Sequence, residues 1–121
     1  MRMIRSISSF HCVAIAALSA LLSLAQPAQA EVYANGTIKV LRTGWNADSF
    51  GIELNAPQQN PAGCPNALGY VSDSSLPGYK TYYAAALAAY QTGKMISVVI
   101  DSNTGVCVMG YPKIIGINLF R

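Results

Sequence analysis

The sequence predicts a small, mainly β domain with one helix, exported from the cytoplasm. Three observations lead to this prediction: a leader-like segment of 30 residues, one cysteine pair beyond it, and short apolar runs broken by glycine, proline and asparagine. One alanine-rich segment interrupts these runs and has the spacing of a helix. The expected order of elements is strand, strand, strand, helix, strand, strand.

Residues 1–30 have the three-part layout of a secretory signal peptide. Two arginines precede an apolar run over residues 10–25, and the segment closes with the small-residue pattern AQA. A transmembrane anchor is the alternative, but it needs roughly 20 apolar residues, and this run is shorter and ends in a polar, proline-containing stretch. We expect cleavage after Ala30, leaving residues 31–121 as one periplasmic or secreted domain with no membrane segment.

Removing the leader changes the charge and the chemistry available. The net charge falls from +3 to +1, because six basic side chains remain against five acidic ones. That value is too nearly neutral to predict binding to nucleic acid or an anionic membrane. The sole histidine, His11, is also lost, which excludes a Ser-His-Asp triad, a Cys-His pair and a histidine-ligated metal site. We predict no catalytic residue, metal or cofactor.

Two of the three cysteines remain after cleavage. Cys12 leaves with the leader, whereas Cys64 and Cys107 form an even pair, which in a small exported domain is typical of a disulfide. A redox-active pair is the alternative, and it would favour a close spacing such as C-x-x-C. Because these cysteines are 43 positions apart, we predict a structural disulfide.

Three strands are expected before the helix. Residues 37–43 (TIKVLRT) alternate and contain β-branched side chains, and residues 50–54 (FGIEL) alternate after the break GWNADS, so the two form a hairpin. Residues 55–66 hold three prolines and a glycine and are predicted to be a surface connection. Residues 67–72 (ALGYVS) can form a short third strand.

The helix is predicted to follow at once. Ser75 is a plausible N-cap, with Pro77 in the first turn, where its missing N–H is not needed. The helix then runs to about Thr92, and Gly93 occupies the position where a left-handed residue ends a helix. Lys94 suits the negative end of the helix dipole.

The remaining chain supplies two strands. Residues 95–101 (MISVVID) form the most strongly apolar strand, SNTG turns the chain, and VCVM carries Cys107 in a short extended piece or loop. Residues 113–120 (KIIGINLF) form the last strand. One helix cannot cover both faces of five strands, so we predict a curled, OB-fold-like barrel with the helix closing one end. An open α+β sheet with the helix on one face is the alternative.

The outer face of the predicted helix lacks charge, although a surface helix normally presents charged residues to water. The inward face is predicted to hold an aromatic and aliphatic stripe: Tyr82, Tyr83, Ala86, Leu87 and Tyr90. The outward face would then hold small and uncharged residues: Thr81, Ala84, Ala85, Ala88 and Gln91. This face is a tolerant surface, is covered by loops, or packs against another copy of the chain.

The second half of the chain resembles a known family. The aromatic and alanine helix ending in TGK, the strand SVVID, the cysteine in GVC and the segment YPKIIGINL are similar to the B subunits of AB5 toxins, particularly those of subtilase cytotoxin type. The resemblance covers about the last 60 residues. It implies an OB-fold, a homopentamer with helices lining a pore, glycan binding on host glycoproteins, an A-type enzymatic partner and a disulfide like Cys64–Cys107.

The loop TGWNADS is the candidate ligand-binding site. Trp45 can stack on the apolar face of a sugar, and Asn46, Asp48 and Ser49 can bond its hydroxyls. The alternative is that Trp45 caps the barrel end and Asp48 makes a turn. Tyr111, in the segment GYP, is the tyrosine expected near a loop surface.

Catalysis is not predicted, although glycoside hydrolysis needs only two carboxylates across a cleft. The candidates are Asp48, Glu53, Asp73 and Asp101, and a chain this short offers little cleft. The leading hypothesis is a secreted, non-catalytic module that binds a glycan and self-associates. A periplasmic structural or inhibitory protein that binds another protein is the alternative. A binder of single-stranded nucleic acid is disfavoured by the charge.

Overall fold

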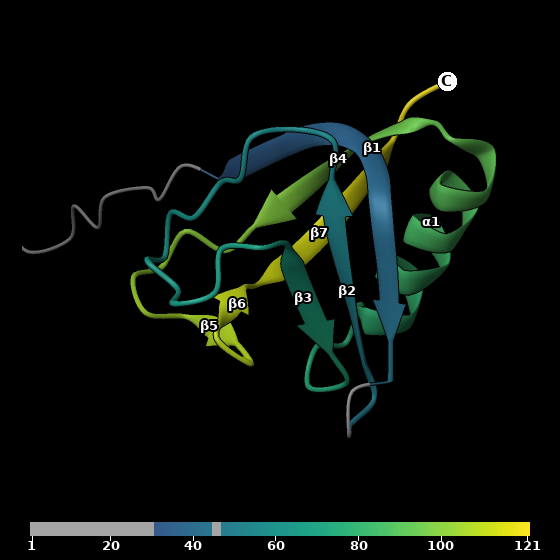
Figure 1. Ribbon diagram of the computed structural model, residues 1–121. Coiled ribbons are helices and arrows are strands. Elements are labelled where there is room, and N and C mark those ends of the chain that lie inside the picture. The colour runs from purple at the N-terminus through teal and green to yellow at the C-terminus, as the bar shows by residue number, and fades with distance from the viewer. Residues whose placement is uncertain (1–30, 45–46) are drawn as a thin grey trace, which may run out of the picture.

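The computed structural model describes residues 31–44 and 47–121, which form a mainly β structure with one helix (Figure 1). The predicted leader, residues 1–30, lies outside the described residues. The mainly β class and the five principal strands are confirmed. The elements are β1 Val32–Thr43, β2 Ser49–Leu54, β3 Tyr70–Asp73, α1 Tyr79–Thr92, β4 Met95–Ile100, β5 Cys107–Val108, β6 Tyr111–Pro112 and β7 Ile114–Leu119.

Five strands form an antiparallel sheet in the order β3-β2-β1-β4-β7. β1 pairs with two other strands. Its first half, Val32–Thr37, pairs with β4, and its second half, Ile38–Thr43, pairs with β2. The register shifts between Ile38 and Val40, and such a bulge bends a strand and increases its twist. β1 starts five residues earlier than predicted, because pairing with β4 outweighs the weak strand propensity of Asn35 and Gly36.

The two outer strands of this sheet approach each other at one point. An isolated parallel bridge joins Val71 in β3 to Lys113, the residue before β7. The sheet is therefore strongly curved, with β3 and β7 on neighbouring sides. The other two strands, β5 and β6, are not part of this sheet. They pair with each other in a separate two-stranded hairpin beside β3, on the side away from α1 (Figure 1).

The main hydrophobic core lies between the sheet and α1. Its buried members are Ala34, Ile38, Phe50, Ile52, Tyr70, Ala86, Ala89, Ile96, Val98, Ile100 and Ile114. Phe50 anchors the helix, with ring centroids 5.8 Å from Tyr79 and 5.6 Å from Tyr83. The inward prediction for Tyr90 is wrong: its side chain is 48% exposed and Ala89 is buried instead. The small Ala89 side chain lets this turn of the helix approach the sheet.

The helix ends where predicted but begins later. Gly93 adopts the left-handed conformation, with φ 64°, and its N–H bonds the Ala89 carbonyl. The predicted N-cap is wrong, because the helix starts at Tyr79 with Gly78 in the cap position. Ser75 is held elsewhere: its N–H and its hydroxyl both donate to the Asp73 carboxylate. A side chain at Gly78 would overlap the Tyr82 ring, with a Cβ only 2.3 Å from the Cζ atom.

The opposite face of β2 and β3 is covered by two long connections. Gly51 and Val71 lie on this face, since a Cβ at Gly51 would meet Val71 Cγ2 at 3.3 Å. Buried side chains outside the main core gather under these connections, as satellite clusters commonly do; they are Ala62, Cys64, Val71, Val108 and Pro112.

The predicted disulfide holds the two connections together. Cys64 and Cys107 are bonded, with their Cα atoms 5.8 Å apart. The Gly105 N–H also donates to the Ala62 carbonyl at 2.8 Å, and the Asn66 N–H donates to the Gly110 carbonyl at 2.9 Å. In the described part of the chain, no helix is long and apolar enough to cross a bilayer.

Candidate functional site

The predicted binding loop is the hairpin connection between β1 and β2. Trp45 and Asn46 lie outside the described residues. The hairpin closes where the Gly44 N–H donates to the Ser49 carbonyl at 3.0 Å, with Gly44 left-handed at φ 75°. Asp48 is exposed, whereas Ser49 is 3% exposed and its hydroxyl donates to the Ala47 carbonyl. Of these two residues, Asp48 is therefore the one presented to a ligand.

The turn between β3 and α1 lies directly against this hairpin. The Ser74 N–H donates to the Asp48 carbonyl at 2.9 Å, and Ser49 pairs with Asp73 in the sheet. Burial raises the pKa of Tyr79 above its usual value, and Asp48, Tyr83 and Asp73 raise it further. The hydrogen bond and the strand pairing bring Asp48 and Asp73 to the same end of the sheet.

We call this group the rim cluster, and define it as Asp48, Asp73, Ser75 and Tyr79. The sequence predicts only Asp48 of these four as a ligand-binding residue; it indicates Asp73 only as a candidate catalytic carboxylate and Ser75 as an N-cap. The other members come from a second segment that the register of β2 with β3 brings alongside. The cluster offers carboxylate acceptors, a hydroxyl and an aromatic ring, the groups that hydrogen-bond and stack on sugars. No group of three or more potential metal ligands occurs among the described side chains.

Tyr111 lies away from the rim cluster. It is half-buried in β6, paired with Val108. Because Lys113 sits opposite Val71 in a parallel bridge, Tyr111 lies level with the start of β3, whereas Asp48 lies beyond its end. At about 3.3 Å per residue, the two positions are separated by roughly 15 Å along the strand. The structure does not bring Tyr111 and Asp48 together.

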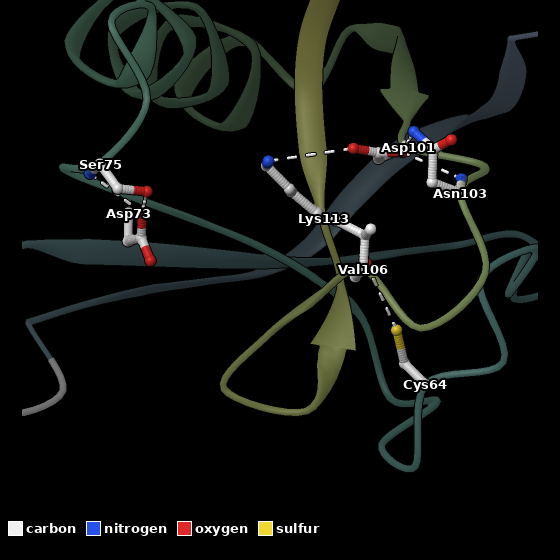
Figure 2. A network of polar contacts seen from close by, with 7 residues as sticks. All are labelled: Cys64, Asp73, Ser75, Asp101, Asn103, Val106 and Lys113. Atoms are coloured by element: carbon white, nitrogen blue, oxygen red, sulfur yellow. Dashed lines mark hydrogen bonds and ion pairs between the residues drawn. The ribbon is translucent and has the colours of Figure 1, made fainter.

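The other two carboxylates considered for catalysis are held in ion pairs. Glu53 pairs with Arg42 across β1 and β2, and the Asp101 carboxylate lies 3.9 Å from Lys113 Nζ. Figure 2 shows Asp101 between Lys113 and Asn103, whose side chain donates to it at 2.6 Å, with Asp73 and Ser75 in a separate contact. These pairs fasten strands and turns to one another.

The predicted outer face of the helix is open to solvent. Thr81, Ala84, Ala88 and Gln91 are exposed, and Ala85 is half-buried. At the C-terminal end of α1 this face meets a groove of about 340 Å³. We call it the end groove; its lining is Ala88, Ala89, Thr92, Lys94, Met95, Leu119, Phe120 and Arg121. No single segment of the sequence predicts this groove, because its walls come from α1, the start of β4 and the end of β7.

Comparisons of the chain with family models, with curated proteins and with solved structures found no match.

Proposed function

We propose that this chain is an exported, non-catalytic binding domain that binds carbohydrate at the rim cluster and the adjoining β1–β2 loop. The observation that carries the proposal is the hydrogen bond from Ser74 to Asp48, which sets two exposed turns side by side. Those turns present two carboxylates and a hydroxyl beside the loop that contains Trp45. The location rests on the leader-like residues 1–30.

A closed barrel of OB type is the fold that this proposal requires. The strand order and the Val71–Lys113 bridge support closure, because the bridge links the outer strand β3 to the residue that precedes the other outer strand, β7. OB-folds bind oligosaccharides and oligonucleotides on the face of their second and third strands and on the flanking loops. Here the two connections that the disulfide joins, residues 55–69 and 101–112, cover that face of β2 and β3. The rim cluster is therefore the accessible part.

The charge at the rim cluster favours a sugar over a nucleic acid. Asp48 and Asp73 lie together at the exposed end of β2 and β3, where two negative charges would repel a phosphate backbone. Sugar hydroxyls, by contrast, donate to carboxylates in charge-assisted hydrogen bonds. The expected ligand is a neutral glycan on a glycoprotein.

Asp48→Asn is expected to weaken glycan binding on the order of tenfold, because hydrogen bonds to charged groups contribute about 1.5–3 kcal/mol. The ligand would be chosen by glycan-array screening of the wild-type protein, and its Kd measured by calorimetry. Glu31→Gln is the matched control, since this exposed carboxylate lies outside the rim cluster.

Two results would contradict the proposal. One is a wild-type protein that binds no glycan on the array. The other is equal loss of affinity in Asp48→Asn and Glu31→Gln. Stoichiometric, Asp48-dependent recovery of a single unglycosylated protein from a periplasmic extract would favour the protein-binding alternative instead.

Self-association through the outer face of α1 is the second part of the proposal. The exposed part of this face carries no charge, and its small side chains permit close approach of another helix. A ring of identical copies, with an A-type enzymatic subunit as partner, is the assembly that the resemblance implies.

Ala88→Glu is expected to reduce the solution mass to that of one chain, because it buries a charge between neighbouring copies. The separated chain should remain folded, because Ala88 is exposed and its substitution does not disturb the core. Its unfolding temperature should therefore stay close to that of a folded single chain. Light-scattering mass and thermal unfolding would test both points. Thr104→Glu, at an exposed turn far from α1 in the sequence, is the control and should keep the wild-type mass. An unchanged mass in Ala88→Glu would remove the helix from the interface.

A further inference from the structure

We infer that the end groove binds a single-chain anionic amphiphile, of the chemical class of a fatty-acid carboxylate. The aliphatic chain would lie over Met95, Leu119 and Phe120, with the carboxylate between Lys94 and Arg121. This site lies at the C-terminal end of α1, whereas the rim cluster adjoins its N-terminal end. It is therefore independent of the glycan site.

The apolar surface of the groove is unusually exposed for a soluble domain. Met95 is 54% exposed, Leu119 53% and Phe120 47%, and all three line the same hollow with Ala88 and Ala89. The volume of about 340 Å³ falls within the range of small-molecule sites, roughly 300–1,000 Å³. At about 30 Å³ for each water-sized group, it has room for about eleven such groups. A medium-length alkyl chain matches that capacity.

The charge of the groove selects the head group. Lys94 and Arg121 are its charged lining residues, and no acidic residue lines it. The ion pairs of the described residues use Arg42 and Lys113, so neither groove cation is neutralised by a carboxylate side chain. An anionic head group is thus complementary to the site, and a cationic one is not.

Two carbonyls at the end of the helix beside the groove have additional hydrogen-bond donors. The exposed carbonyls of a last helical turn carry partial negative charge. In this chain the Thr92 hydroxyl donates to the Ala88 carbonyl at 2.9 Å, and the Lys94 N–H donates to the Ala89 carbonyl at 3.3 Å. The Ala88 and Ala89 carbonyls therefore already have donors, and Lys94 lines the groove beside them.

A free amphiphile suits this site better than a flat bilayer or a second protein copy. The groove is a hollow of about 340 Å³ between the end of α1, the start of β4 and the end of β7, a volume that suits a single alkyl chain. The outer face of α1 that we assign to self-association meets the groove only at Ala88. The experiment below distinguishes the proposed amphiphile from a bilayer and from a second copy of the chain.

Titration of the purified protein with sodium dodecanoate below its critical micelle concentration, by calorimetry, tests the site. We expect saturable 1:1 binding, weakened about two- to fourfold for each methylene removed in decanoate and octanoate. Dodecanol should bind more weakly, and dodecyltrimethylammonium more weakly still. Lys94→Gln and Arg121→Gln should each weaken dodecanoate binding about two- to fivefold, as expected for solvent-exposed ion pairs. Lys80→Gln, at the other end of α1, should not.

Leu119→Ser provides a test of the apolar floor, and its control is Met109→Ser, since Met109 lies outside the groove and is 44% exposed against 53% for Leu119. Only the first should weaken dodecanoate binding. The inference is overturned by the absence of saturable binding, or by equal effects of Lys94→Gln and Lys80→Gln. It is also overturned if the protein sediments with phosphatidylglycerol vesicles but does not bind dodecanoate. Finally, a Leu119-dependent oligomer that excludes dodecanoate would assign the groove to a second copy.

Discussion

Replacing both Cys64 and Cys107 by alanine is expected to lower the free energy of unfolding by roughly 4 kcal/mol. The bond closes a loop with a sequence separation of 43 residues, and the chain-entropy estimate for a loop of that length gives this value. Small domains have unfolding free energies of about 5–15 kcal/mol, so the loss is a large share of the total. Alanine is the appropriate substitute because Cys64 is 4% exposed, and a serine hydroxyl there would need a new partner.

The measurement is chemical unfolding of the oxidised wild type, the reduced wild type and the double alanine variant. The free energies of unfolding of the two forms without the bond should agree within about 1 kcal/mol. Their unfolding temperatures should lie on the order of 20 °C below that of the oxidised wild type. Hydrogen exchange should rise first in residues 101–112, because that connection is tied to residues 55–69 by the bond and two backbone hydrogen bonds. A loss below about 1 kcal/mol would mean that those hydrogen bonds and the buried cluster hold the connections without the disulfide.

The strands that were predicted best are those whose pattern is local. β2 and β4 alternate or run apolar between clear turn residues, and their observed bounds lie within one residue of those predicted. The first half of β1 was missed because its stability comes from β4, some 60 residues further along the chain. The N-cap was wrong for a related reason: Asp73, at the end of β3, takes both donors of Ser75.

The candidate sites show the same division between local and non-local information. Asp48 could be found because it stands in a loop beside an aromatic residue. Asp73 is only one of four candidate carboxylates in the sequence, and its place beside Asp48 could not be predicted, because the register of β2 against β3 sets it. Tyr79 follows from the same register and could not be predicted either. The end groove is a stronger case, since Lys94 precedes β4 and Leu119 ends β7, and nothing in either segment indicates the other. Residue type predicts which side chains can bind, whereas strand register decides which of them meet.

The face of β2 and β3 that is turned away from the helix is covered, and this limits where a ligand could bind. The barrel expectation alone would place a ligand across these strands. Val71 is 2% exposed, because residues 55–69 and 101–112 lie over it with the disulfide between them. The bond that stabilises the domain therefore also helps to keep this face closed, and both proposed sites, the rim cluster and the end groove, lie outside it.

Phe50→Ala is expected to lower the free energy of unfolding by about 3–5 kcal/mol, the range for removing a large buried aromatic side chain. Phe50 is 1% exposed, and it is the contact through which β2 holds Tyr79 and Tyr83 of the helix. Phe50→Leu is the control, because it keeps most of the volume and should cost less than about 1.5 kcal/mol. Urea unfolding of both variants would measure the difference.

The same substitution links the core to the rim cluster, because Tyr79 belongs to both. If Phe50 fixes the start of α1, then Phe50→Ala should weaken glycan binding even in the fraction that remains folded, whereas Phe50→Leu should weaken it less. A double-mutant cycle with Tyr83→Ala would measure the aromatic contact itself, with a coupling of about 0.5–1.5 kcal/mol expected. Additive losses in that cycle would show that Phe50 stabilises the sheet without fixing the helix. The rim cluster would then be held by the hydrogen bond from Ser74 to Asp48, the pairing of Ser49 with Asp73 and the two hydrogen bonds from Ser75 to Asp73.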